Sequence, residues 1–234
     1  MPSPHRGQNG SVTEHPQAVA FDVVETLFSL EPVRRRLQSI GLPGAALECW
    51  FSGFLRDAVA LSAAGPYTPF RPVAAGSLAV FLGRHGVDPS DETVDGVLAG
   101  FGELDAHPDV RPALERLRDR SIPAVALSNG AADATASLLA RAGLEPLVER
   151  VFSIDEVRRW KPFPEPYLHA AAQLGLRPGQ LAMVAVHAWD VHGAKRAGLV
   201  TGWASRLEGR WHPAMVPPDV VGASLVEVVE GLVG

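Results

Sequence analysis

Four short apolar runs, separated by longer segments with helical periodicity, constrain the fold of this chain more than any other feature of its sequence. A strand covered on both faces of a sheet is typically a nearly continuous apolar run. Such runs lie at 17–24, 122–127, 181–186 and 200–204. Segments with helical periodicity lie at 110–120, 131–142, 164–174 and 190–197. Strands that alternate with helices predict βαβ units, and therefore an α/β fold with a doubly wound parallel sheet.

The segment between the first two strands has a different pattern. It contains four helical stretches separated by Gly and Pro, at 33–40, 45–62, 72–85 and 90–104, with no strand between them. A crossover between parallel strands needs a helix of only ~10–15 residues. We therefore expect residues 28–104 to form an inserted helical cap domain on a core made of 17–27 and 105–234. Residues 1–16 are polar and aperiodic, which predicts a disordered tail.

Charge and cysteine content exclude several classes of function. The chain has 21 Lys and Arg against 26 Asp and Glu, a net charge of −5, so no basic surface for nucleic acid or an anionic membrane is expected. Its single cysteine, Cys49, cannot form an internal disulfide. The sequence has neither a signal-peptide pattern nor an apolar run near the ~18 residues of a membrane span. These features predict a cytoplasmic protein that acts on a small molecule.

Polar residues follow three of the predicted strands. Asp22 ends the first run, Ser128-Asn129-Gly130 ends the second, and His187 and Asp190 follow the third. In doubly wound folds, ligands bind at the carboxyl ends of the strands. We therefore expect these groups to meet in one crevice.

Each of these groups also has an ordinary structural interpretation. Asp22 is either a nucleophile that forms an ester or a carboxylate that caps the next turn. Ser128 and Asn129 form an anion site or a common turn. Lys161 precedes a Pro-rich helix start, where its ammonium either keeps Asp22 ionised or lies on the surface. Asp190 is also suited to an N-cap.

Histidines and arginines complete the set of candidates. His187 and His192 are candidates for a base or a ligand, but two histidines alone make a poor zinc site. Arg56 and Arg71 are the cations in the predicted cap that are candidates for binding an anionic substrate.

Four motifs in this order resemble those of the haloacid dehalogenase (HAD) superfamily, and specifically its 2-haloacid dehalogenase branch. The motifs are FDVVETLF, LSNG, WKPFPEPY and VHAWDVHGAKRAGL, and the resemblance spans about 18–206. It implies a Rossmann-like core with a helical cap. It also carries the expectation of a homodimer formed through the cap.

The resemblance implies a role for each matching residue. Asp22 corresponds to the nucleophile, Thr26 to the hydroxyl that braces it, and Lys161 to the lysine that neutralises it. Asp190 matches the acid that positions the lysine and the hydrolytic water. The expected substrate-binding residues are Ser128, Asn129, Tyr167, His187 and Arg56, with Arg56 replacing a cap arginine that would fall near Phe51 or Ser52.

Two departures from the superfamily pattern bear on the reaction. Phosphatases of the superfamily carry an acid two residues after the nucleophile, where this chain has Val24, which cannot transfer a proton. They also usually carry a second acid in the fourth motif, where this chain has Ala185 and Val186. The resemblance therefore favours a cofactor-free hydrolase that displaces halide from a small carboxylic acid through an aspartyl ester. The alternatives are a phosphatase with Mg²⁺ on Asp22 and Asp190, and a binding protein without catalysis.

Overall fold

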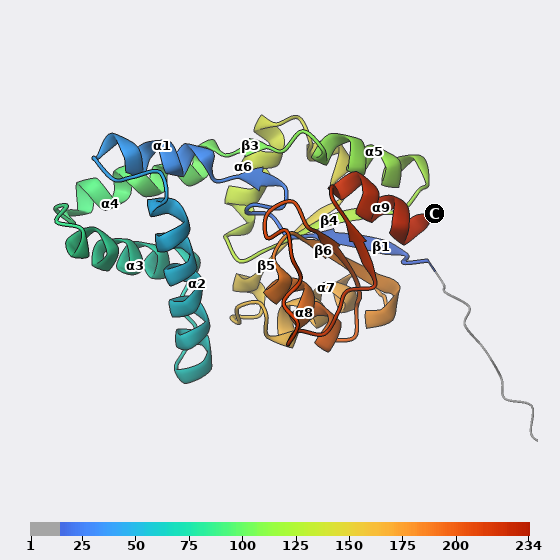
Figure 1. Ribbon diagram of the computed structural model, residues 1–234. Coiled ribbons are helices and arrows are strands. Elements are labelled where there is room, and N and C mark those ends of the chain that lie inside the picture. The colour runs from blue at the N-terminus through green and yellow to red at the C-terminus, as the bar shows by residue number, and fades with distance from the viewer. Residues whose placement is uncertain (1–14) are drawn as a thin grey trace, which may run out of the picture.

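The apolar runs of the sequence form the central strands of a six-stranded parallel sheet in the computed structural model, which describes residues 15–234 (Figure 1). The four expected strands are β1 (Ala18–Phe21), β4 (Ala124–Ser128), β6 (Leu181–Ala185) and β7 (Val200–Ala204). Every residue of β1, β4 and β6 is buried, which is why these segments are apolar throughout. Of the expected tail 1–16, residues 1–14 lie outside the described range, and Pro16 is buried.

The strands are ordered β5-β4-β1-β6-β7-β8, and all neighbouring pairs are parallel. From β1 the chain proceeds to β4 and β5 on one side, then returns to the other side for β6, β7 and β8, as in a doubly wound sheet. The two edge strands, β5 (Arg150–Ser153) and β8 (Val220–Gly222), were not predicted. Both are short and partly exposed, so neither shows a continuous apolar run.

Helices cover both faces of the sheet (Figure 1). One face packs against α5 (Val110–Asp119), α6 (Ala132–Arg141) and α9 (Leu225–Val233). The other packs against α7 (Pro164–Gln173) and α8 (Ala188–Arg196). Along β1, Val19 and Phe21 join the first cluster, and Ala18 and Ala20 join the second. The predicted fold class is therefore confirmed.

Four helices between β1 and β4 lie together beside the sheet (Figure 1), and we call this group the cap. They are α1 (Glu31–Ser39), α2 (Ala46–Ala64), α3 (Phe70–Arg84) and α4 (Asp91–Leu98). The short strands β2 (Phe28–Ser29) and β3 (Asp105–Ala106) pair antiparallel where the chain enters and leaves the cap. Three short 3-10 helices lie outside the cap, between strands of the large sheet in the chain order. They are η2 (Glu145–Leu147), η3 (Ile154–Glu156) and η4 (Pro178–Gln180).

The expected helix at 90–104 is divided. It is α-helical only to Leu98 and continues as the 3-10 helix η1 (Ala99–Glu103). Gly100 lies so close to α1 that an added Cβ would be 3.0–3.1 Å from atoms of Val33 and Arg36. This close packing against α1 is a tertiary contact, which helical periodicity does not reveal.

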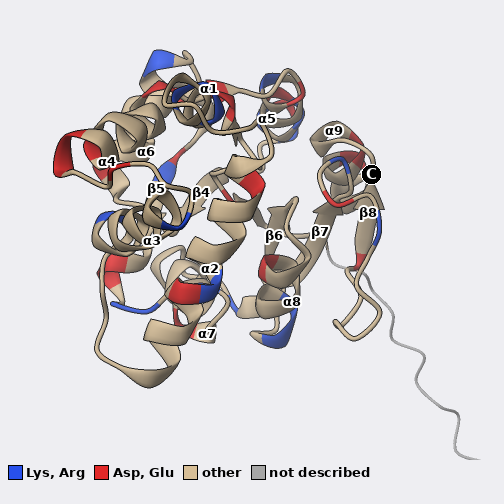
Figure 2. Ribbon diagram, turned by 60° about the vertical axis from the view of Figure 1, so that its left-hand side comes forward, with Lys and Arg blue, Asp and Glu red and all other residues tan. Residues whose placement is uncertain are grey.

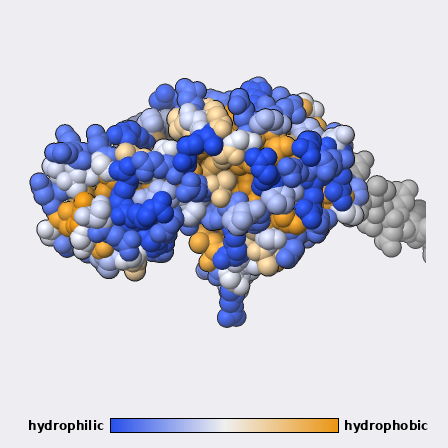
Figure 3. All heavy atoms as spheres, turned by 90° about the horizontal axis from the view of Figure 1, so that it is seen from above, coloured by the Kyte–Doolittle hydropathy of each residue, from blue (hydrophilic) through white to orange (hydrophobic). Residues whose placement is uncertain are grey.

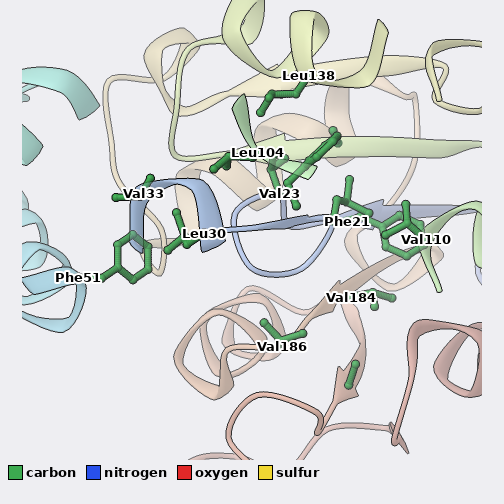
Figure 4. Close-up of a cluster of buried hydrophobic side chains, with 14 of the residues drawn as sticks. Phe21, Val23, Leu30, Val33, Phe51, Leu104, Val110, Leu138, Val184 and Val186 are labelled. Carbon is green, nitrogen blue, oxygen red and sulfur yellow. The ribbon is translucent and has the colours of Figure 1, made fainter. Parts of the chain in front are cut away.

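One continuous cluster of buried side chains joins the sheet to the cap. Figure 4 shows this continuity, from Phe21 and Val184 in the sheet, through Leu104, to Val33 and Phe51 in the cap. The carboxyl end of β1 therefore lies beneath apolar side chains of the cap. Within residues 15–234, no helix combines the length and apolar character that crossing a membrane requires.

Candidate active site

Three charged side chains are buried within residues 15–234, and one of them, Lys161, contacts the other two. In the described part of the chain, Asp22, Lys161 and Asp190 are the only buried Asp, Glu, Lys or Arg residues. The other charged residues lie mainly on the outer helices and loops, as Figure 2 shows. Buried charges destabilise a protein unless they are paired and hydrogen-bonded, so they often mark functional sites.

Asp22 follows directly after β1, and its backbone N–H continues the sheet by donating to Val184 O at 3.0 Å. Thr26 Oγ1 donates to Asp22 Oδ2 at 2.7 Å, and Lys161 Nζ donates to Oδ1 at 2.8 Å. The Thr26 hydroxyl also accepts the N–H of Val186 at 3.1 Å, which ties the turn after β1 to the end of β6. The carboxylate is thus held from both sides, and the Asp22 side chain is 8% exposed.

Lys161 has an acceptor for each of its three ammonium protons. Nζ donates to Asp22 Oδ1 at 2.8 Å, to Leu127 O at 2.9 Å and to Asp190 Oδ2 at 2.7 Å. Burial of the ammonium acts to lower its pKa, but the two carboxylates outweigh this effect, so the pKa of Lys161 is raised above its ordinary value of 10.5. The group therefore stays positively charged at neutral pH and orients the Asp22 carboxylate.

Asp190 lies behind the lysine rather than beside a pocket. It is fully buried, and Tyr167 Oη donates to its Oδ1 at 2.6 Å while Lys161 donates to Oδ2. Burial raises the pKa of Asp190, and the Lys161 ammonium opposes that rise. Burial and the neighbouring carboxylate raise the pKa of Tyr167 well above 10.0, so its hydroxyl remains a donor.

The expectation that Tyr167 contacts substrate is therefore corrected. Its side chain is 0% exposed and lies among apolar residues between α7 and the sheet. Its hydroxyl contacts Asp190, so Tyr167 positions the acid that in turn positions Lys161. The residue lies on a buried face of α7, a direction that the motif alone does not specify.

Ser128 and Asn129 present hydrogen-bond donors near Asp22. Ser128 Oγ accepts the N–H of Gly130 at 2.9 Å, so its own O–H remains available to donate. Asn129 Oδ1 accepts the N–H of Lys161 at 3.1 Å, which leaves the amide NH₂ as a donor. Two such donors are suited to an anionic group of a substrate.

A small pocket of about 20 Å³ joins these groups. Asp22, Ser128, Asn129 and His187 supply its polar wall. The rest of the wall is Val24, Phe51, Phe70 and Trp189. The centroid of the His187 ring lies 5.6 Å from that of Trp189 and 6.4 Å from that of Phe51. The ring makes no hydrogen bond to any described residue. Its nitrogens are therefore available to substrate or water.

The structure does not bring Arg56 to this site. Its side chain is 73% exposed and pairs with the adjacent Asp57. On α2 the buried face carries Phe51, Phe54 and Ala58, and Arg56 lies on another face of the helix. Arg71, the other expected cation, pairs with Asp95.

Three residues that contribute to the site were not identified from the sequence. Arg206, noted only as the end of the motif match, donates to Thr26 O at 2.5 Å and Glu25 O at 3.2 Å, and pairs with Asp109. It therefore fixes the turn that carries Asp22 and Thr26. Phe70 and Trp189 line the pocket because two cap helices and the start of α8 converge there. No local pattern distinguishes such aromatic residues from core residues.

The side chains do not fit the Mg²⁺ site that Asp22 and Asp190 would form. Both oxygens of Asp190 already accept hydrogen bonds, and the Lys161 ammonium lies between the two carboxylates. Mg²⁺ prefers six oxygen ligands, and residues 15–234 contain no cluster of three or more His, Cys, Asp or Glu placed to hold a metal. The positive charge at this position is supplied by the lysine.

Comparison with known proteins agrees with this geometry. Residues 16–198 match the haloacid dehalogenase-like hydrolases. The (S)-2-haloacid dehalogenase of Xanthobacter autotrophicus is 30% identical over 194 residues, which cover 82% of this chain and 76% of that enzyme.

Solved structures show the same likeness. A crystal structure of an L-2-haloacid dehalogenase matches with a TM-score of 0.88 at 27% identity, covering 94% of this chain and 100% of that chain. The Xanthobacter autotrophicus L-2-haloacid dehalogenase with chloropropionic acid covalently bound matches with a TM-score of 0.84 at 26% identity, covering 92% of this chain and 97% of that chain. The chain belongs to the family of haloacid dehalogenase-like hydrolases.

Proposed function

We propose that this protein hydrolyses 2-haloacids, displacing halide through an ester on Asp22. The observation that carries the proposal is the Asp22 carboxylate, held by Lys161 and Thr26 beside a pocket with two free donors. The likeness to 2-haloacid dehalogenases supports the same reaction. Val24 also lines the pocket, and displacement of halide does not require the proton donor that Val24 lacks.

In the first step, an oxygen of Asp22 attacks the carbon that bears the halogen. A carbon–oxygen bond forms, the carbon–halogen bond breaks, and halide leaves with the electron pair. The substrate carboxylate accepts hydrogen bonds from Ser128 and Asn129, which fixes the reacting carbon opposite Asp22. Lys161 and Thr26 hold the nucleophile without contacting the leaving group.

In the second step, water attacks the carbonyl carbon of the Asp22 ester. We assign the removal of the water proton to His187, because it is the only titratable side chain besides Asp22 among the residues that line the small pocket. The bond between that carbon and the substrate oxygen then breaks, and the 2-hydroxy acid leaves with a proton. Asp190 acts through Lys161, since both of its oxygens are occupied.

The reaction proposed here uses no metal or organic cofactor. The charge that a metal would supply beside the nucleophile comes from Lys161, whose raised pKa keeps it protonated. The donors of Ser128 and Asn129 replace a cation in binding the substrate anion.

The test is halide release from 2-chloropropionate by wild type, Asp22→Asn and the exposed control Asp133→Asn. We expect release from wild type and the control, and at least a ~10³-fold loss with Asp22→Asn because no nucleophile remains. In ¹⁸O-labelled water, one turnover places label in Asp22, as mass spectrometry of its peptide would show. Absence of both release and label across a panel of 2-haloacids would overturn the proposal in favour of binding without catalysis. Mg²⁺-dependent hydrolysis of p-nitrophenyl phosphate would instead identify a phosphatase.

A further inference from the structure

A second, much larger cavity lies between the cap and the core. Its volume is about 570 Å³, within the range of roughly 300–1,000 Å³ that is usual for small-molecule sites. Its walls come from α3, from α4 and η1, from the turn after Asp22, and from α6 with the loop before it. Figure 3 shows apolar surface where the cap side of the molecule meets the core side.

The large cavity adjoins the small pocket at Asp22. Val24, Phe70 and Ser128 line both. The small pocket, at about 20 Å³, has room for little more than one water, which needs roughly 10–15 Å³. A substrate whose reacting carbon lies at Asp22 therefore finds space for further carbons only across Val24 and Phe70, in the large cavity.

The chemistry of the walls favours a hydrocarbon. Most lining residues are apolar, and they include Phe70, Ala74, Leu98, Phe101, Leu104 and Leu138. The two charged lining residues already have partners, since Arg71 pairs with Asp95 and Asp155 accepts the hydroxyl of Tyr67. A charged group would therefore find no unpaired charged residue in the lining, whereas burial of an alkyl chain there is favourable.

We propose that the preferred substrates are 2-haloalkanoic acids with an alkyl chain of several carbons, and that the chain occupies this cavity while the carboxylate binds Ser128 and Asn129. This inference rests on the proposed function and names its substrate class. Phe70 and Val24 lie between the small pocket, where the substrate reacts, and the large cavity, where its alkyl chain binds. They therefore contact the substrate near its third carbon.

The first experiment measures halide release along the series 2-chloropropionate, 2-chlorobutyrate, 2-chlorohexanoate and 2-chlorooctanoate. Burial of each methylene is expected to raise kcat/KM about fourfold until the cavity is filled. A value of kcat/KM that is flat or falls from the shortest acid to the longest would overturn the chain-binding proposal and leave the dehalogenase proposal intact.

Two variants narrow the cavity from opposite walls. Ala134→Phe acts from α6 and Ala99→Phe from η1, and both alanines line the cavity at exposed positions, where the folded state tolerates a larger residue. The matched control is Ala136→Phe, exposed on the same helix as Ala134 but outside the cavity lining. We expect Ala134→Phe and Ala99→Phe to lower kcat/KM for 2-chlorooctanoate at least tenfold and to change that for 2-chloropropionate less than twofold. Equal effects on both acids would contradict the inference.

A binding measurement separates the two proposals. Calorimetric titration with octanoate and propionate, which carry no halogen, reports on the cavity without turnover. Tighter binding of octanoate that is lost in Ala134→Phe and kept in Ala136→Phe supports a chain site even if no 2-haloacid releases halide, in which case only the proposed reaction fails. Equal affinity for both acids would overturn the chain site.

Discussion

The ammonium of Lys161 lies 2.8 Å from Oδ1 of Asp22, although 139 residues separate the two in the chain. The contact forms because Asp22 follows directly after β1 and the backbone carbonyl of Leu127, in the neighbouring β4, accepts a second proton of the same ammonium. The nucleophile's orientation is therefore a property of two adjacent parallel strands and one loop.

The buried charges differ in what their removal does to stability. Lys161→Met leaves the carboxylates of Asp22 and Asp190 buried without their shared cation, and we expect a loss of about 3–5 kcal/mol in the free energy of unfolding. Asp22→Asn leaves one ammonium facing one carboxylate, so its effect is expected to stay within about 1 kcal/mol, although activity is lost. Urea denaturation of both variants checks this. Equal losses would show that the lysine is not the shared partner.

The raised pKa values of Tyr167 and Lys161 predict that the free energy of unfolding falls at high pH. Both pKa values are raised in the folded protein, above 10.0 and 10.5 respectively, so the folded state keeps protons that the unfolded chain releases. Their stabilisation is complete below pH 10 and is lost as the pH rises further, by about 1.4 kcal/mol per pH unit for each proton.

Tyr167→Phe isolates one of these protons. The free energy of unfolding of this variant is expected to be about 1–3 kcal/mol lower at pH 7, because Asp190 Oδ1 loses its hydrogen-bond donor. Above pH 10, the free energy of unfolding should fall less steeply with pH than in wild type. Urea denaturation between pH 7 and 11 measures both effects. An unchanged alkaline slope would mean that Tyr167 ionises in the folded state as it does in the unfolded chain.

His187 is expected to act in hydrolysis of the ester and not in its formation. His187→Asn keeps a polar side chain at the pocket but removes the base, so halide release should show a burst followed by turnover at least ~10²-fold slower. Intact-protein mass spectrometry should then detect the ester on Asp22. The control is His192→Asn, because His192 Nδ1 accepts the N–H of Val216 and does not line the pocket. A uniform slowing with no burst would argue against this assignment.

Gly193 is expected to tolerate no side chain. An added Cβ would be 2.5 Å from Cβ and 2.7 Å from O of Pro162, the residue after Lys161. Gly193→Ala should therefore lower the free energy of unfolding by about 1–3 kcal/mol. The same clash should shift Pro162 and with it Lys161, which lowers kcat. Gly53→Ala, in α2 with nothing within 4 Å, should instead stabilise the protein by roughly 0.5–1 kcal/mol. Thermal denaturation and halide release compare the two. Similar effects would show that α8 can move away from Pro162.

The sequence alone was sufficient for the central layer of this protein. Strands β1, β4, β6 and β7 were predicted because burial on both faces requires apolar residues at nearly every position. Asp22 stood out because a carboxylate at the end of such a strand must be hydrogen-bonded or paired. Lys161 was equally compatible with a surface position, and only the resemblance of its motif to that of the HAD superfamily assigned it to the site. The edge strands β5 and β8 escaped prediction because their exposed sides remove the continuous apolar signal.

Only the tertiary structure decided which side chains face the reaction. Tyr167 contacts Asp190 and not the pocket, Arg56 lies on the exposed side of α2, and both oxygens of Asp190 are occupied. The large cavity likewise comes from walls that lie far apart in the sequence. Sequence patterns record how strongly a position is buried, because burial selects residue type. The direction of a side chain and the space between the cap and the sheet depend on how the helices and strands pack against one another, which no local pattern encodes.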